Sequence, residues 1–327
     1  MASDVIAGGN PGLAGLQAYP FQRLRRLLDG IKPASTAMPV PLSIGEPKHP
    51  VPDFIAEAFR AGVDSGLGRY PATAGMPELR AGIADWLRWR FGLIDARIDP
   101  DRHVLPAAGT REALFAVTQA LIDPANRPAV FMPNPFYQIY EGAALLAGGR
   151  PRMLNTGGGG IPDLDGIEER EWAECGLIYL CSPGNPTGRV MPQAFWDRLF
   201  AIRDRHGFVI AADECYSELY HDEQAPPLGL LAACQAAGRD DFRGCLVFHS
   251  LSKRSNVPGL RSGFIAGDAA LIEAFAAYRT YQGCALPFHA QQASLAAWRD
   301  ETHVRENRAA YRRKFAMARE TLADIAP

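Results

Sequence analysis

Between residues 100 and 250, the sequence repeatedly alternates a short apolar run with a segment of helical periodicity. The expected strands are residues 103–109, 128–133, 176–181, 207–213 and 245–250, and the expected helices between them include 110–123, 136–148 and 192–206. Short runs of Val, Ile, Leu and Ala that alternate with helices are typical of a parallel sheet covered on both faces. We therefore predict an α/β fold with a largely parallel sheet between helices.

The flanking segments read mainly as helices. Helical spacing predicts helices at 19–30, 52–66 and 76–92, and a mostly helical segment from residue 268 onward. Residues 39–52 are extended and punctuated by proline. The glycine run at 156–160 is expected to be a loop, because it has neither the lysine nor the strand-to-helix setting of a phosphate-binding loop.

Charge and cysteine usage exclude several classes of protein. The chain has 34 Lys and Arg against 36 Asp and Glu, so we expect neither nucleic-acid binding nor a polybasic membrane anchor. Its six cysteines show no Cys-x-x-Cys spacing, which favours buried thiols in a reducing compartment. Signal-peptide features and an apolar run of about 18 residues are both lacking, so a cytoplasmic protein is expected.

Ligands of such sheets bind at the carboxyl ends of the strands, so polar residues that follow a strand are the candidates for a site. Gly109, Thr110 and Arg111 follow the first expected strand and begin a helix, where free N–H groups bind anions such as phosphate. The alternative is an ordinary N-cap formed by Thr110. Tyr137 follows the second strand, and its ring either lies against a flat ligand or packs on the helix start.

Two further motifs follow the third and fourth expected strands. "CSPGNPTG" at 181–188 is a loop restricted by its prolines that presents the amide of Asn185. Asp213 ends an apolar run, where a buried carboxylate needs a partner such as a protonated ring nitrogen, and Tyr216 can point to the same side. The alternatives are a structural asparagine in a turn and an aspartate that caps a loop.

The fifth motif is "FHSLSKRSNVPGLRSGF" at 248–264. Ser250 and Ser252 flank the strand end, and Arg261 follows a Pro-Gly turn. Hydroxyl groups and one guanidinium suit a phosphate. Lys253 lies among these cations, and a desolvated lysine near other cations has a lowered pKa and becomes an amine nucleophile. The alternative is a solvated basic loop.

Together and in this order, the five motifs resemble the fold type I pyridoxal-phosphate enzymes, in particular the class I and II aminotransferases. The resemblance extends over almost the whole chain from "PLSIGEP" at 41–47 onward. It implies an α/β fold with a mostly parallel seven-stranded sheet in a large cofactor domain at 46–285. Residues 1–45 are implied to form an N-terminal arm and part of a small α+β domain, and 286–327 the interdomain helix and the start of that domain.

The resemblance also implies roles for single residues. Lys253 would bind pyridoxal 5'-phosphate as an imine and move a proton at the substrate Cα, while Asp213 would keep the ring nitrogen protonated and the ring an electron sink. Asn185 and Tyr216 would bond the phenolic oxygen, and Tyr137 would stack on the ring. The implied phosphate site consists of Gly109, Thr110, Arg111, Ser250, Ser252 and Arg261.

Two more residues and a substrate class come from the same resemblance. Tyr70 matches a tyrosine that reaches the phosphate of the neighbouring subunit, which implies a homodimer with shared sites, and Gly45 matches a loop that contacts the substrate carboxylate. Several longer strings are similar to the N-succinyldiaminopimelate aminotransferases of lysine biosynthesis. Amino-acid and keto-acid substrates, here N-succinyl-LL-2,6-diaminopimelate and 2-oxoglutarate or glutamate, are therefore expected.

Aminotransferases of this kind carry, in a further C-terminal segment, an arginine that binds the α-carboxylate of the substrate. No residue of this sequence matches it, so we expect a chain ending at residue 327 to bind cofactor and to transaminate poorly. Four other interpretations remain open: another amino-acid aminotransferase, a C–S β-lyase of the same fold, a cofactor-binding but inactive fragment, and the cofactor-sensing module of a transcription regulator. The first 40 residues are too short and not basic enough for the DNA-binding domain of such a regulator.

Overall fold

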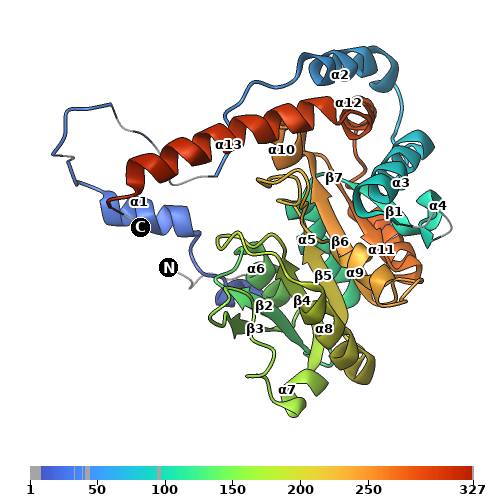
Figure 1. Ribbon diagram of the computed structural model, residues 1–327. Coiled ribbons are helices and arrows are strands. Elements are labelled where there is room, and N and C mark those ends of the chain that lie inside the picture. Colours follow the sequence, from blue (N-terminus) through green and yellow to red (C-terminus); the bar gives the residue numbers. More distant parts are fainter. Residues whose placement is uncertain (1–8, 33, 39, 41–44, 94–96, 326–327) are drawn as a thin grey trace.

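A seven-stranded sheet runs through the centre of the computed structural model, which describes residues 9–32, 34–38, 40, 45–93 and 97–325 (Figure 1). In sheet order the strands are β1 (Val104–Ala107), β7 (Gly263–Gly267), β6 (Cys245–Ser250), β5 (Val209–Asp213), β4 (Cys175–Cys181), β2 (Ala129–Asn134) and β3 (Arg150–Asn155). The fold predicted from the sequence and the resemblance, an α/β fold with a mostly parallel seven-stranded sheet, is confirmed.

One strand runs against the others. β7 pairs antiparallel with both β1 and β6, whereas all other neighbouring pairs are parallel. Gly263, the first residue of β7, lies opposite Ala107 on one side and Ser250 on the other. The start of β7 therefore lies beside the ends of β1 and β6.

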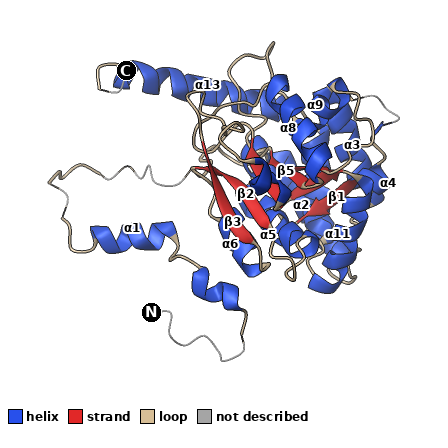
Figure 2. Ribbon diagram, turned by 90° about the horizontal axis from the view of Figure 1, so that it is seen from below, coloured by secondary structure: helices blue, strands red, loops and turns tan. Residues whose placement is uncertain are grey.

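Helices cover both faces of the sheet (Figure 2). One face is covered by α2 (Asp53–Gly66), α3 (Pro77–Phe91), α7 (Glu169–Ala173), α8 (Gln193–His206), α9 (Leu230–Ala236) and α12 (Phe288–Arg299), and the other by α5 (Thr110–Leu121), α6 (Ile139–Leu146) and α11 (Ala269–Gln282). Successive strand residues alternate between the two cores: Phe131 packs in the first, and its neighbours Val130 and Met132 in the second.

The remaining helices are short or lie at the ends of the described chain. They are α1 (Pro20–Leu28), α4 (Pro100–His103), α10 (Leu251–Arg254), α13 (Thr302–Leu322) and two 3₁₀ turns, Pro11–Gly15 and Pro258–Leu260. In Figure 1, α13 extends away from the sheet toward the side where α1 lies. None of the helices in the described ranges is both long and apolar enough to cross a lipid bilayer.

The five strands and the helices expected from periodicity are present, but the residue pattern alone did not indicate β3 and β7. β3 is an edge strand with the sequence "RPRMLN", in which only Leu154 is fully buried, so it lacks the apolar run of a central strand. β7 is five residues long and begins and ends with glycine, which is depleted in strands.

Candidate functional site

All the polar motifs that follow the expected strands lie at one edge of the sheet. β1, β2, β4, β5 and β6 are parallel, so the residues after them emerge on the same side. Because β7 runs the opposite way, its first residue lies at this edge, and Arg261 precedes it by two positions. The topology thus gathers Gly109, Thr110, Arg111, Tyr137, Asn185, Asp213, Tyr216, Ser250, Ser252, Lys253 and Arg261 at one edge.

Asp213 is the buried carboxylate at the centre of this edge. It ends β5, is only 5% exposed, and lies between Cys181 of β4 and Phe248 of β6. The Tyr140 hydroxyl donates to Oδ2 over 2.8 Å and the Cys215 backbone N–H donates to Oδ1 over 3.2 Å. Burial raises the pKa of Asp213, and these hydrogen bonds oppose the rise. Among the described residues, no cationic side chain bonds it, so a cationic ligand would be a suitable partner.

Tyr216 and Cys215 complete the turn after β5. Burial raises the pKa of the Tyr216 phenol, and the neighbouring Cys215 and Asp213 raise it further, so its hydroxyl stays protonated and able to donate. The Thr110 hydroxyl lies 2.9 Å from the Cys215 sulfur. This contact ties the first residue of α5 to the turn that carries Asp213.

Lys253 projects from α10, the short helix after β6. Its Nζ donates a hydrogen bond to the carbonyl oxygen of Gly45, so the predicted lysine and the predicted substrate-loop residue are in contact. Partial burial lowers the pKa of Lys253, and the Cys215 and Glu46 side chains oppose the shift. A lowered pKa increases the neutral fraction of the amine, which is the nucleophilic form.

The predicted anion-binding groups cluster around the start of α5. Gly109 has φ of +89°, and a Cβ there would lie 2.5 Å from Nη2 of Arg261, so the two residues are in close contact. Ser250 accepts a hydrogen bond from the backbone of Ser252 and donates one to its hydroxyl. Free N–H groups at a helix start, hydroxyls and a guanidinium form a cradle for a phosphate.

Arg111 and Tyr137 hold each other beside this cradle. Nε of Arg111 donates to the Tyr137 hydroxyl over 2.7 Å, and Nη2 donates to Tyr19 of the N-terminal segment over 3.4 Å. The predicted stacking ring therefore has its outer end fixed by the predicted phosphate-site arginine.

Two predicted residues make no such contact. The Asn185 side chain is exposed and forms no hydrogen bond within the described part of the chain, although its loop does follow β4. Tyr70 is 101% exposed and touches none of the other candidates in the described structure. Its expected role in a neighbouring subunit remains a prediction.

Tyr140 is a buried residue of the site that our reading of the sequence missed. It lies three residues after Tyr137 in "NPFYQIY", and its hydroxyl bonds Asp213. The sequence predicts a helix over 136–148, in which positions i and i+3 share a face, but nothing in it shows that Tyr140 lies close to Asp213; α6 itself begins at Ile139.

The turn that carries Lys253 is anchored from the C-terminal helices, which the sequence also did not indicate. Arg254 is 2% exposed; its guanidinium packs against the rings of Trp86 and Trp298 and bonds the Ala297 carbonyl over 2.8 Å. Asn307 of α13 donates to the backbone carbonyls of Lys253 and Arg254 over 3.1 and 3.3 Å. These contacts fix the backbone from which the lysine extends.

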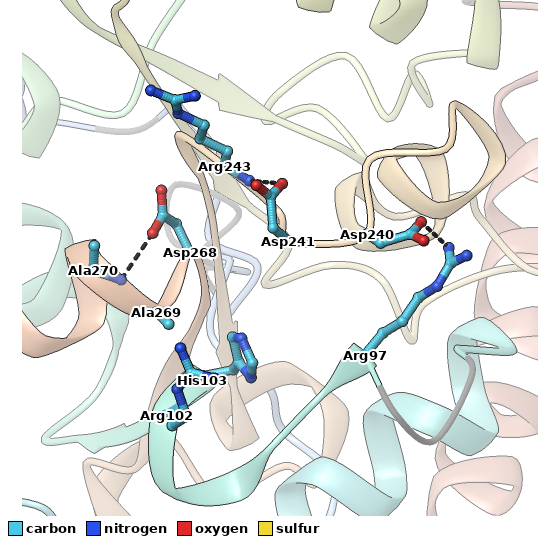
Figure 3. Close-up of a pocket in the computed structure, with 9 residues that line it drawn as sticks. All are labelled: Arg97, Arg102, His103, Asp240, Asp241, Arg243, Asp268, Ala269 and Ala270. Atoms are coloured by element: carbon cyan, nitrogen blue, oxygen red, sulfur yellow. Dashed lines mark hydrogen bonds and ion pairs between the residues drawn. The ribbon is translucent and has the colours of Figure 1, made fainter.

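A second cavity, of about 720 Å³, lies at the opposite edge of the sheet, near the start of β6 and the end of β7 (Figure 3). Arg97 pairs with Asp240 there over 2.6 Å, and Asp268 caps α11 through the Ala270 N–H. None of the predicted site residues lines it. It is therefore separate from the Lys253 site.

The residues at the Lys253 edge fit pyridoxal 5'-phosphate. Asp213 is a buried carboxylate bonded only by neutral donors, which suits a pyridinium nitrogen. The missing side chain of Gly109 leaves room beside Arg261, where a phosphate can approach the helix start. Lys253 supplies a partly desolvated amine for an aldehyde carbon.

Comparison with known proteins places the chain in a family. Residues 37–326 match the family model described as aminotransferase class I and II. The chain is 33% identical over 279 residues to LL-diaminopimelate aminotransferase of Nitratidesulfovibrio vulgaris (strain DSM 19637 / Miyazaki F), covering 84% of this chain and 69% of that one. It is 37% identical over 277 residues to 4-dedimethylamino-4-oxo-anhydrotetracycline transaminase OxyQ of Streptomyces rimosus, covering 84% and 71%.

The structural comparison agrees. A crystal structure of an aminotransferase from Neisseria meningitidis Z2491 superposes with a TM-score of 0.90 at 48% sequence identity, covering 94% of this chain and 77% of that one. The matching family model, the fold and the residues at the sheet edge are all consistent with one family. The chain belongs to the class I and II aminotransferases, which are pyridoxal-phosphate-dependent transaminases.

Proposed function

We propose that the Lys253 edge is the active site and that the amino group moves between N-succinyl-LL-2,6-diaminopimelate and 2-oxoglutarate, with glutamate as donor in the biosynthetic direction. The observation that supports the site is that a half-buried lysine and a buried aspartate follow or end adjacent parallel strands, β6 and β5, and so lie at the same edge of the sheet. The substrate rests on the likeness of the sequence strings to N-succinyldiaminopimelate aminotransferases. A relative named for LL-diaminopimelate makes the unsuccinylated amine the second candidate.

In this proposal, the side chains of the chain bind the cofactor and move protons. When bound, pyridoxal phosphate supplies an electron sink conjugated to the substrate Cα. Asp213 holds a positive charge on the ring nitrogen, and Tyr216 with Asn185 donates hydrogen bonds to the phenolic oxygen. Lys253 would hold the cofactor through Nζ until the substrate amine displaces it, and the freed neutral amine would then accept and return the proton of the substrate Cα, which its lowered pKa supports.

The remaining residues of the site bind and orient the cofactor and the substrate in this proposal. We assign the phosphate to the α5 amino terminus with Gly109, Thr110 and Arg111, and to Ser250, Ser252 and Arg261. Tyr137 is assigned to the ring face, where its bond to Arg111 limits its motion. Gly45, which accepts a hydrogen bond from Lys253, is assigned to the substrate-carboxylate side of the site.

The proposal includes a homodimer in which Tyr70 of the partner subunit completes each phosphate site. The full exposure of Tyr70 in a single chain supports it. We retain the division into an arm at 1–45, a cofactor domain at 46–285 and a small-domain segment at 286–327. All six cysteines are free thiols, which supports a reducing, cytoplasmic location.

Visible absorption tests the site. The wild-type chain with pyridoxal phosphate is expected to show an imine band that Lys253→Ala loses, with Lys314→Ala of α13 as the matched control that keeps it. An unchanged band in Lys253→Ala would place the nucleophile elsewhere.

A substrate panel tests the reaction. The wild-type chain is given N-succinyl-LL-2,6-diaminopimelate or LL-diaminopimelate with 2-oxoglutarate, and glutamate is measured. A higher kcat/KM with the succinylated amine supports our assignment, and a higher value with the free amine would replace it by the second candidate. Pyruvate and ammonia released from a C–S substrate without a keto acid would indicate a β-lyase.

A further inference from the structure

The Asp213 carboxylate is set in a pocket whose hydrogen-bond donors are neutral. Its donors are the Tyr140 hydroxyl, the Cys215 backbone N–H and the Cys215 thiol. The titratable groups around it are Tyr137 and Tyr140 at the α6 end, Tyr179 and Cys181 on β4, Cys215 and Tyr216 after β5, and His249 on β6. Because burial favours the neutral acid, charge at Asp213 depends on these donors, and the nearby His249 also favours the charged form.

Tyr140 is held so that its hydroxyl points at this carboxylate. The residue is fully buried, and its ring stacks on Tyr179 at 4.5 Å and 11°. Tyr137 meets the other side edge-on, with centroids 5.8 Å apart. Tyr179 is in turn anchored by its own hydroxyl, which donates to the Leu114 carbonyl of α5. A ring packed this way has little freedom to turn its hydroxyl away from Asp213.

The Tyr140 hydroxyl and the Cys215 backbone N–H differ in kind. The Cys215 N–H belongs to the main chain, so every side-chain variant except proline retains it. The Tyr140 hydroxyl is the shorter bond and a side-chain group that can be removed without changing the shape of the ring. A hydrogen bond to a charged acceptor favours the charged form, so its removal favours protonation of Asp213.

We propose that Tyr140 is a positioning residue that keeps the Asp213 carboxylate charged and in one orientation for its cationic partner. The inference rests on the proposed function, in which that partner is the pyridinium nitrogen of the cofactor. Tyr140 touches Asp213 and not the reacting atoms. Its effect is therefore expected in cofactor affinity and in the pH dependence of that affinity.

The test compares Tyr140→Phe with Tyr179→Phe in the full chain. The Kd for pyridoxal phosphate is measured by tryptophan fluorescence quenching from pH 5.5 to 8.5, with far-UV circular dichroism as a folding check. For Tyr140→Phe we expect the Kd to rise about 10-fold at neutral pH, and the acid limb of the affinity profile to move up by about one pH unit. Tyr179→Phe removes a hydroxyl from the same stack but none from Asp213, so its acid limb is expected to stay in place.

The outcomes separate the two proposals. A Tyr140→Phe profile that superimposes on the wild type, or an equal shift in both variants, overturns the role of Tyr140. Failure of the wild-type chain to bind, or unchanged binding by Lys253→Ala, overturns the proposed site as well. If Tyr140→Phe does not fold, 3-fluorotyrosine is placed at position 140, because it keeps the shape of the ring and its hydroxyl donates more strongly. The acid limb of the affinity profile must then move to lower pH. An acid limb that does not move contradicts the inference.

Discussion

Gly109→Ala tests whether the cradle at the start of α5 depends on one missing side chain. Gly109 has φ of +89° and ψ of 156°, a conformation that is essentially restricted to glycine, so alanine is expected to destabilise the fold by about 1–3 kcal/mol. In a chain of this size that lowers Tm by roughly 1.5–4.5 °C. The new Cβ would lie 2.5 Å from Nη2 and 3.0 Å from Cζ of Arg261. The guanidinium must therefore leave its place beside the helix start.

The loss of this guanidinium sets the expected effect on the cofactor. A charge-assisted bond between arginine and phosphate contributes about 1.5–3 kcal/mol, so the Kd for pyridoxal phosphate is expected to rise about 10- to 100-fold. Equilibrium titration of the purified chain measures it, and Arg261→Ala should show a similar loss.

A double-mutant cycle isolates the mechanism. In the Arg261→Ala background, Gly109→Ala should change the Kd little, because the group it displaces is already absent. Gly238→Ala is the control: Gly238 also has a positive φ, +70°, but a Cβ there meets nothing within 4 Å, so Tm should fall while the Kd stays constant. Additive effects of Gly109→Ala and Arg261→Ala on the Kd would refute the reasoning.

Three further outcomes follow from buried charges. Burial lowers the pKa of Lys253, so its amine should react with acetic anhydride at lower pH than the other three lysines; equal pH profiles by peptide mapping would contradict this. Glu218→Ala leaves the buried Arg90 and Arg308 without their shared carboxylate, so the free energy of unfolding measured in urea should fall by about 3–5 kcal/mol. A fall of less than about 1 kcal/mol would contradict the importance of these ion pairs. Hydrogen bonding by Arg308 lowers the pKa of Glu223 from 4.5 to about 2, so its stabilisation is present above pH 4.5 and lost as pH falls toward 2. Because Glu223 is partly exposed, Glu223→Gln should lower the free energy of unfolding by only about 1 kcal/mol at pH 7 and should not change it near pH 2. A loss of stability that persists at pH 2 would contradict this pH dependence.

The sequence predicts the parts of the fold that repeat a strong local pattern. β4 and β5 are continuous apolar runs, and the helices between the strands carry the 3.6-residue period, so both kinds of element are visible from the residues alone. β3 and β7 are not, because an exposed edge and a strand between two glycines gain their stability from neighbours that are distant in sequence. Non-local pairing overrides local propensity at both places.

The residues of the candidate site also divide into those that the local sequence indicates and those that it does not. Lys253, Asp213 and Arg261 stand in distinctive strings at strand ends, so the position of each relative to the sheet could be predicted. Tyr140 and Asn307 act on these residues from elements elsewhere in the chain, and nothing in their own local sequence marks the contact. Such supporting residues depend on tertiary packing, which a single sequence does not display.

The position of β7 between β1 and β6 fixes the width of the predicted phosphate cradle. Gly263 pairs with both Ala107 and Ser250, so the strand ends that lead into Gly109 and Ser252 are each one strand spacing from the same residue. Two such spacings place them roughly 10 Å apart. This width is a constant of β-sheet geometry and not a product of side-chain packing. The loops that enter and leave the cradle can therefore change in sequence while the gap between these strand ends keeps its size.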